Sequence, residues 1–362
     1  MKVLLSYPTE FDKGEGIHYS RVLRRLGHEV IELNVACSAR DWGGAGRTLP
    51  GFSSEVTIQE LADLFGKPDL YLYIEPLGLI PRGLEKAPMP TACIICDTHR
   101  QLHHRQVLAR LFDHVFLYQR NYVTRFDDHP PGTVHWLPYA CDVDTFRDLG
   151  RVRDVDVGFV GQLFGPNSER RRILELLSKN YHVNEQRNYL QSEIPEVYSR
   201  AKIVLNLPVG DDLNFRFFEA LSCGAMLLTK RIANGQELLF REGKHYVAFA
   251  GDHDLLEKVN YYLSHEEDRQ RVAAEGAQEV LRNHTLSMRV QQLLTKVGAG
   301  PAGKAPIRAM DRGSAAKIYF EVLERMGRVE SILRLSVDHP ELRWVGRWKA
   351  LKTLGRRMIL NW

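Results

Sequence analysis

The side chains with the clearest chemical potential lie in a loop between a predicted strand, 202–207, and a predicted helix, 215–222. The loop carries two neighbouring acids, Asp211 and Asp212. The first backbone amides of a helix have no partner within the helix, so they can receive an anion. The amides in this position belong to Leu213, Asn214 and Phe215.

Arg216 and Glu219 follow on the same predicted helix. The guanidinium of Arg216 presents forked donors that suit a phosphate group. The carboxylate of Glu219 has the acceptor oxygens to bind both hydroxyls of a ribose. The pattern therefore predicts a pocket for a nucleoside diphosphate. The alternative is structural, with Asp212 or Asn214 capping the helix and Glu219 complementing the helix dipole.

The run from Asn214 to Thr229, Asn-Phe-Arg-Phe-Phe-Glu-Ala-Leu-Ser-Cys-Gly-Ala-Met-Leu-Leu-Thr, resembles the signature of the GT-B glycosyltransferases of retaining family 4 (glycosyl transferases group 1). It is most similar to the CgeB-like spore-maturation branch. In that family a strand is followed by an acid, seven residues and Glu-Ala-x-Ala-Cys-Gly. Asp211 and Glu219 have this spacing, with Asp where the family usually has Glu. The resemblance implies that Glu219 holds the donor ribose, and that Asp211 or the amides after it approach the donor sugar.

A second segment resembles the phosphate strand and basic helix of the same family. It is the run Val-Gly-Phe-Val-Gly ending at Gly161, followed by the arginine-rich stretch 168–177. The resemblance implies that Gly161 adjoins the phosphates and that Arg170 and Arg171 neutralise the diphosphate leaving group. The family often has Arg directly after this glycine, where this chain has Gln162. The alternative for the arginine run is a solvated helix face.

The stretch 193–206 resembles the helix and strand that precede the donor loop, which implies that Asn188 and Tyr189 lie near the base. Residues 136–142 are similar to the crossover between the two domains, and 14–30 to the opening loop and helix. The resemblance covers about residues 1–297, and the donor loop is its specific part.

In the first half of the chain, Asp97 and His99 directly follow an apolar strand pattern at 91–96. Ligands of open parallel sheets bind outside the carboxyl ends of the strands, so we predict acceptor or donor-sugar recognition here, with His99 as a possible proton shuttle. The alternative is a turn stabilised by the Asp side chain. Gly14 and Gly16 fail as a dinucleotide fingerprint, because a third Gly is missing, and they predict a cleft loop instead.

The five cysteines do not predict a disulfide framework or a metal site. Cys93 and Cys96 lie in an apolar run with no second Cys pair near them. His103 and His104 follow, but adjacent residues of a helix do not share a face. We therefore predict two core thiols, no bound metal and no cofactor. A UDP- or GDP-linked sugar would serve as co-substrate.

Apolar runs alternate with helix-period segments along most of the chain, which is typical of parallel sheets built from crossover units. The predicted strands are 2–6, 29–33, 69–74, 91–96, 114–117, 133–136, 155–160, 202–207, 225–229 and 246–249. We predict an α/β fold of two Rossmann-like domains facing each other across a cleft: an acceptor domain, 1–140, and a donor domain, 141–297. A Gly- and Pro-rich linker and a helical extension, 298–362, follow.

The extension has a local excess of positive charge, with 13 Lys and Arg against 6 Asp and Glu, whereas the net charge of the whole chain is +4. This small net charge argues against a nucleic-acid-binding protein. In the last predicted helix, 341–360, the residues Trp344, Trp348 and Leu351 share one face. We expect this aromatic face to pack on the first domain. The alternative is a helix that lies in a membrane interface.

The N-terminus has no secretory signal and no stretch is long enough to span a membrane. This predicts a cytoplasmic location, with a peripheral membrane contact left open.

Together these observations predict a metal-independent glycosyltransferase that moves a sugar, with retention of configuration, from a nucleoside-diphosphate sugar to an acceptor. The acceptor could be a glycan, a protein, a lipid or a small molecule. In such a site Arg side chains and helix dipoles stabilise the leaving diphosphate. The rival hypotheses are a sugar-nucleotide epimerase or phosphorylase on the same fold, and a nucleotide-sugar-binding protein that has lost catalysis.

Overall fold

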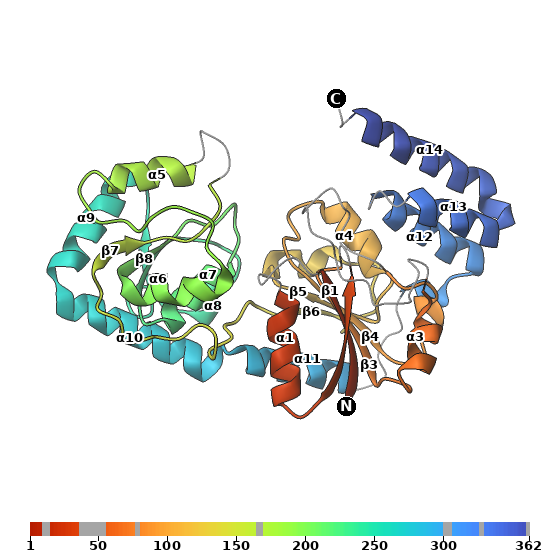
Figure 1. The fold of residues 1–362 in the computed structure, drawn as a ribbon, viewed down its shortest axis with the longest axis horizontal. Helices are drawn as coiled ribbons and strands as arrows, with labels where there is room; N and C mark the ends of the chain where they lie inside the picture. The colour runs from red at the N-terminus through yellow and green to blue at the C-terminus, as the bar shows by residue number, and fades with distance from the viewer. Residues whose placement is uncertain are drawn as a thin grey trace. The chain divides into compact units, whose positions relative to one another are not determined.

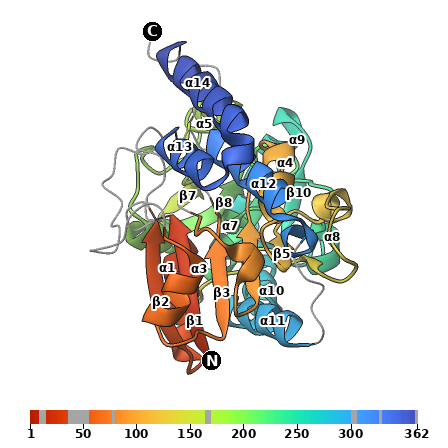
Figure 2. The same ribbon diagram turned by 90° about the vertical axis from the view of Figure 1, so that its right-hand side faces the viewer.

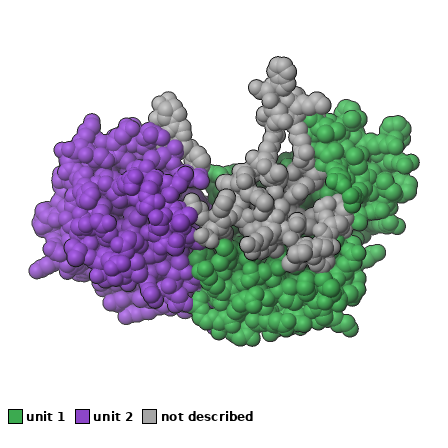
Figure 3. Space-filling model, in the orientation of Figure 1, with its two compact units in different colours: residues 1–118, 122–137, 292–362 green, residues 119–121, 138–291 purple. Residues whose placement is uncertain are grey.

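The computed structural model of the chain describes residues 1–8, 15–35, 56–76, 80–163, 169–299, 306–325 and 329–359. The chain divides into two compact units (Figure 3). The first unit consists of residues 1–118, 122–137 and 292–362, and the second of residues 119–121 and 138–291. The chain thus returns to its first unit after residue 291, and the segment predicted as a separate extension belongs to that unit.

The first unit is built on a six-stranded parallel sheet (Figures 1 and 2). Its strands are β1 (Lys2–Pro8), β2 (Glu29–Val35), β3 (Leu70–Ile74), β4 (Thr91–Ile95), β5 (His114–Leu117) and β6 (Val134–Trp136), in the spatial order β2-β1-β3-β4-β5-β6. Every residue of β3, β4 and β5 is buried. Such strands have helices over both faces, which is why the sequence shows apolar runs rather than alternation.

The helices of the first unit come from both ends of the chain. They are α1 (Glu15–Arg25), α3 (Ile58–Leu64), α4 (Leu102–Ala109), α12 (Arg312–Arg325), α13 (Val329–Asp338) and α14 (Arg343–Ile359), with short 3-10 helices at Leu84–Lys86, Pro306–Ala309 and Pro340–Leu342. Helix α12 lies beside α4, and α13 and α14 lie beyond α12 (Figure 1). Side chains of all three helices join the core formed by β3, β4 and β5. Arg308 makes a bidentate ion pair with the buried Asp113, with both N···O distances at 2.7 Å.

The expectation that the aromatic face of the last helix packs on the protein was wrong. Trp344 and Trp348 are 80% and 69% exposed. Helix α14 packs instead through its opposite face, where Gly346, Ala350 and Thr353 are buried. The small residue at Gly346 explains the choice, because a Cβ atom there would lie 1.7 Å from Oγ of Ser336 on α13.

The second unit has a four-stranded parallel sheet in the order β10-β9-β8-β7. Its strands are β7 (Val155–Gly158), β8 (Ala201–Asn206), β9 (Met226–Lys230) and β10 (Val247–Phe249). Its helices are α5 (Glu169–Leu177), α6 (Ile194–Arg200), α7 (Phe215–Ser222), α8 (Gln236–Leu239), α9 (Asp252–Ser264), α10 (Glu266–Asn283) and the start of α11 (Leu286–Gly298), with a 3-10 helix at Gln191–Glu193.

Each sheet has a point where the strand order reverses. In the first unit β1 lies between β2 and β3. The chain therefore places β2 on one side of β1 and the next strand, β3, on the other side. In the second unit Val183 forms a parallel bridge with Val157 on one side of β7, while β8 pairs on the other side. The crevice outside the carboxyl ends of the strands at such a reversal is where open α/β sheets bind ligands.

All ten predicted strands are confirmed, with boundaries that differ by up to two residues. A 3-10 helix, Arg120–Arg125, follows β5. Cys93 and Cys96 are buried free thiols, as predicted. Most of the predicted linker lies outside the described residues. No helix in the described part of the chain is long and apolar enough to cross a membrane.

Candidate functional site

The predicted donor residues gather where β7 and β8 end, at the strand reversal of the second unit. β8 ends on Asn206, which is fully buried. Its amide nitrogen donates to Oγ1 of Thr229, 3.1 Å away on β9. Its amide oxygen accepts from Asn214 at 3.2 Å and from Arg216 at 2.9 Å. One side chain therefore ties the ends of two strands to the start of α7.

Arg216 is held at this edge by three contacts. Besides its bond to Asn206, its Nε donates to the carbonyl oxygen of Val160 at 2.8 Å. Its guanidinium carbon lies 4.7 Å from the centre of the Phe159 ring, a distance typical of a cation–π contact. The second terminal nitrogen lies against Gly161, where a Cβ atom would approach it to 2.5 Å. Any larger residue at this position would have to displace the guanidinium.

Arg170 reaches the same place from α5. Its Nε donates to the carbonyl oxygen of Leu207 at 2.9 Å and a terminal nitrogen donates to that of Gln162 at 3.0 Å. Its guanidinium carbon is 5.9 Å from the centre of the Phe159 ring. Two fixed positive charges thus share one aromatic ring. Arg171 follows Arg170 on α5, so its side chain leaves the helix about 100° further round.

Helix α7 begins at this cluster, and the side chain of its N-cap residue does not cap it. Asn214 is the N-cap residue in extended conformation, and its side chain makes no capping hydrogen bond. The capping alternative is therefore wrong for Asn214, whose amide group bonds to Asn206 instead. Its side-chain oxygen is buried and has no hydrogen-bond partner among the described residues. Leu213 is buried, and Phe215 packs edge-on against Tyr139 at 4.4 Å between ring centres.

Asp211 is engaged in holding loops together. Its carboxylate accepts from the backbone N–H of Ala233 at 2.5 Å and from the side-chain amide of Asn121 at 3.2 Å. Its backbone oxygen accepts from Asn234 at 3.0 Å. Asp211 therefore fixes the loop after β9 next to the loop after β8, which is a structural function for a residue that the resemblance places near the donor sugar.

The remaining donor residues lie at the margins of the cluster. Glu219 is three residues after Arg216 on α7, so the two share a helix face, and its side chain is partly exposed. Tyr189 is buried and accepts a hydrogen bond from Asn184, whose amide also bonds both backbone groups of Phe159. Asn188 is exposed. The sequence did not assign a function to Phe159, Asn184 or Asn206, although Phe159 and Asn206 lie within segments that resemble the family.

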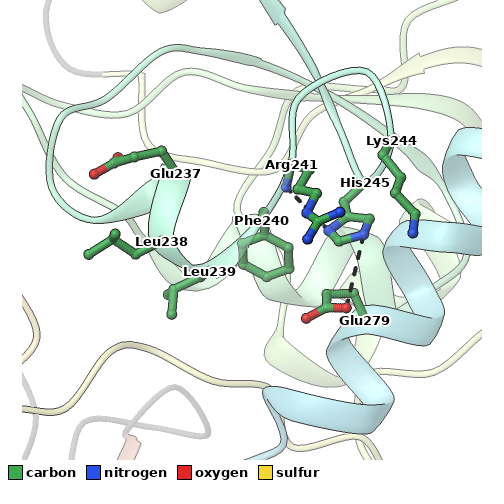
Figure 4. Close-up of a pocket in the computed structure, with 8 residues that line it drawn as sticks. All are labelled: Glu237, Leu238, Leu239, Phe240, Arg241, Lys244, His245 and Glu279. Carbon is green, nitrogen blue, oxygen red and sulfur yellow. Dashed lines mark hydrogen bonds and ion pairs between the residues drawn. The ribbon is translucent and has the colours of Figure 1, made fainter.

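A separate surface pocket of the second unit is lined by residues 237–241, Lys244, His245 and Glu279 (Figure 4). His245 faces Glu279 across 4.0 Å. Lys244 and His245 precede β10, so they lie toward the amino ends of the parallel strands. This pocket is therefore distinct from the cluster at the carboxyl ends of β7 and β8.

In the first unit, an acidic cluster occupies the corresponding strand reversal. The carboxylate of Glu15, at the start of α1, accepts from the hydroxyl of Tyr118 at 2.7 Å and from Sγ of Cys96 at 3.3 Å. Glu75 follows β3, accepts from the backbone N–H of Cys96 at 2.7 Å and pairs with the buried Arg105. Burial, with a smaller contribution from the charge of Glu75, raises the pKa of Glu15 to about 8.

Asp97 and His99 lie beside this cluster. Asp97 and Glu75 both have a left-handed backbone, with φ of 43° and 47°, which is uncommon for residues other than glycine. Asp97 pairs with Arg100 at 3.6 Å, and its backbone oxygen accepts from the N–H of Arg100 in a turn. Nε2 of His99 is buried without a hydrogen-bond partner among the described residues. A left-handed backbone at residues such as Asp97 and Glu75 is a form of strain that is concentrated at functional sites.

Gly14 lies outside the described residues. Gly16 is in the first turns of α1, and a Cβ atom there would meet the Tyr7 ring at 2.0 Å. Close packing of α1 on β1, and not loop freedom, requires this glycine. The sequence missed Glu15, Glu75 and Arg105 because they converge only when three strand ends meet. In the described residues no group of three or more His, Cys, Asp or Glu side chains could hold a metal ion.

The fold is that of the GT-B glycosyltransferases, as the comparison with solved structures shows. Sucrose-phosphate synthase from Thermosynechococcus elongatus has a TM-score of 0.58 and 12% identity, over 82% of this chain and 98% of that one. Alr3699/HepE from Anabaena, in complex with UDP and glucose, has a TM-score of 0.57 and 12% identity, over 83% and 100%. An alpha-glucosyltransferase in complex with UDP-glucose and DNA has a TM-score of 0.58 and 12% identity, over 82% and 99%.

At the level of sequence, residues 146–295 match a family model described as glycosyl transferase-like. This range contains β7, β8, α5 and α7, and therefore the whole arginine cluster. A search of curated proteins found no match to the chain.

Proposed function

We propose that this protein is a glycosyltransferase. Its second unit binds a nucleoside-diphosphate sugar, and its first unit binds the acceptor. The observation that carries the proposal is the gathering of Arg170, Arg216 and the N-terminal end of α7 at the carboxyl ends of β7 and β8, inside the range that matches the glycosyl transferase-like model. Similar folds in complex with UDP, UDP-glucose or UDP and glucose support a uridine nucleotide as donor, with a guanosine nucleotide as the other choice.

The chemistry follows from where charge develops. When the bond between the anomeric carbon and the diphosphate oxygen breaks, the bonding electrons leave with the diphosphate. Donors already fixed in place stabilise that charge without having to reorganise. Arg170 and Arg216 meet this requirement, because backbone carbonyls and the Phe159 ring hold both guanidinium groups. We propose that they act where other transferases use a metal ion, and that the sugar keeps its anomeric configuration, as the resemblance implies.

Glu219 would accept hydrogen bonds from the ribose, since it shares the face of α7 that carries Arg216. The side-chain oxygen of Asn214 would accept a hydroxyl of the donor. On the acceptor side, Glu15, Asp97 and His99 surround the strand reversal of the first unit and would bind acceptor hydroxyls. These assignments rest on the positions of the groups and, for Glu15, on burial that raises its pKa.

The test compares two arginines on one helix. Arg170→Ala removes a guanidinium from the cluster, whereas Arg172→Ala removes an exposed one that pairs with Asp252. Thermal unfolding is measured with UDP, GDP and their sugars, with and without EDTA. We expect one nucleotide to raise the unfolding temperature of the wild type and of Arg172→Ala. The same nucleotide should raise that of Arg170→Ala and Glu219→Ala far less. EDTA should change none of these responses.

If no nucleotide stabilises the wild type, the donor site is refuted. If Arg170→Ala and Arg172→Ala respond alike, the cluster does not bind the diphosphate. If EDTA abolishes the stabilisation, the donor site needs a metal. Release of nucleoside diphosphate from the stabilising sugar nucleotide then tests for transfer, and binding without release would favour a protein that has lost catalysis.

A further inference from the structure

Helix α14 presents a continuous apolar face to solvent. Trp344, Trp348, Leu351 and Leu354 are 80%, 69%, 63% and 40% exposed. At 3.6 residues per turn these four side chains project from one side of the helix. Soluble proteins rarely leave such a group of large apolar side chains uncovered, and where they do, the surface usually binds something.

The opposite face of α14 is fixed to the protein. Ala350 and Thr353 are 2% and 3% exposed, and Gly346 packs against Ser336 of α13. Lys349 and Lys352 both reach Glu324 of α12, at 2.5 and 3.0 Å. These contacts set the rotation of the helix about its axis. The outward direction of the tryptophans is therefore a property of the folded unit and not of a loose terminus.

Basic side chains border the apolar face on both sides. Arg343 and Arg347 are exposed along one edge, and Lys352 along the other. The guanidinium of Arg347 lies over the Trp344 ring at 5.9 Å. No acidic residue occurs between Arg343 and the end of the chain, and residues 298–362 carry 13 basic against 6 acidic residues. The charge around the apolar face is thus of one sign.

We propose that α14 is a docking helix for an anionic lipid surface. Tryptophan prefers the boundary between head groups and acyl chains, because its ring is apolar and its N–H is polar. Lys and Arg beside an apolar helix face are attracted to anionic lipids. In this arrangement helix α14 lies parallel to the membrane surface, because its other face stays packed on α12 and α13. Leu333 and Val337 of α13, 44% and 67% exposed, add apolar surface to the same helical hairpin.

The charge pattern favours a lipid surface over a second copy of the chain. Two copies meeting through α14 would bring the basic edges together, and like charges repel. An anionic membrane supplies the opposite charge and the apolar interior at once. The proposal is independent of the donor site, because none of its residues belongs to the arginine cluster.

The experiment is sedimentation of the full chain with vesicles of phosphatidylcholine alone or mixed with phosphatidylglycerol. We expect binding to the mixed vesicles, weakened by salt. The double variant Trp344→Gln/Trp348→Gln should lose most of it. Arg343→Gln/Arg347→Gln should weaken it by about thirtyfold, from roughly a factor of five for each charge removed. A matched control, Leu238→Gln/Leu281→Gln, changes two exposed leucines of the second unit and should bind like wild type.

The fold of each variant is checked by its thermal unfolding, which should match the wild type because the changed side chains are exposed. Failure of the wild type to bind mixed vesicles would refute the proposal. Equal binding by the tryptophan variant and the wild type would also refute it. If the tryptophan variant instead abolishes a concentration-dependent dimer seen by analytical ultracentrifugation, while vesicle binding is absent, the face is an interface between copies.

Discussion

At the scale of single residues, Glu15 is a carboxylate placed where a charge is costly. It lies between the Tyr118 hydroxyl and the Cys96 thiol, and burial raises its pKa to about 8 from a reference value of 4.5. Removing a charged group from water disfavours its ionised form. At neutral pH the folded protein therefore holds a proton on Glu15, which suits exchange of a proton with a bound hydroxyl.

This proton makes stability depend on pH. Between the two pKa values the folded state binds a proton that the unfolded chain has released, so stability should fall as pH rises from about 6.5 to about 8, by at most about 1.4 kcal/mol per unit. Glu15→Gln should remove this contribution. The measurement is urea unfolding of both proteins at the two pH values, and the difference between them isolates Glu15 from the histidines. Equal slopes would mean that Glu15 titrates normally in the folded protein.

Sequence alone located the arginines and Gly161 but not the residues that hold them. Arg216 follows a loop of polar residues, and resemblance to a known signature gives it a function. Asn206 ends an apolar strand, and nothing around it in the sequence indicates that its amide binds Arg216, Asn214 and Thr229. A buried hydrogen-bond network is defined by three-dimensional contacts, so its central residue has no pattern to detect.

At the scale of elements, the strands were predictable because buried parallel strands give apolar runs of four to seven residues between polar turns. The orientation of α14 was not. Helical periodicity shows which residues share a face, but it does not show which face meets the protein. The contact that decides the orientation of α14 is Gly346 against Ser336. The prediction from sequence relied instead on the tryptophans, which are larger.

Close approach of two helices also positions α7, which carries part of the proposed donor site. Gly276 of α10 lies where a Cβ atom would be 2.4 Å from the backbone oxygen of His245 and 2.6 Å from Leu221 of α7. Gly276→Ala should destabilise the protein by about 1–3 kcal/mol, because backbone must move. It should also weaken nucleotide binding through α7. Gly298→Ala is the matched control, since no atom lies within 4 Å of that Cβ position, and its effect should stay within about 0.5 kcal/mol. Urea midpoints compare the two, and equal midpoints would show that α10 can shift without cost.

At the scale of the whole molecule, each unit has its own core, and the first unit is closed by the end of the chain. Arg308 brings this returning segment into place: it pairs with Asp113 and donates to the carbonyl oxygens of Ala87 and Met89. Asp113 also accepts from the N–H and the hydroxyl of Thr91, both at 2.9 Å. The C-terminal helices are therefore part of the first unit's stability, although they lie far from its strands in the sequence.

Because each unit has its own core, we predict that the two units unfold in separate calorimetric transitions. Arg308→Met leaves the buried Asp113 without its ion-pair partner, which should destabilise the first unit by about 3 kcal/mol or more. A saturating nucleotide, at about 100 times its dissociation constant, should stabilise the second unit by about 2.7 kcal/mol. In a differential scanning calorimetry trace, the substitution should lower one transition and the nucleotide should raise the other. The wild type without nucleotide supplies the reference for both shifts. If substitution and nucleotide move the same single transition in opposite directions, the two units unfold as one cooperative body, and the donor site would then depend on the returning C-terminal segment as much as on its own core.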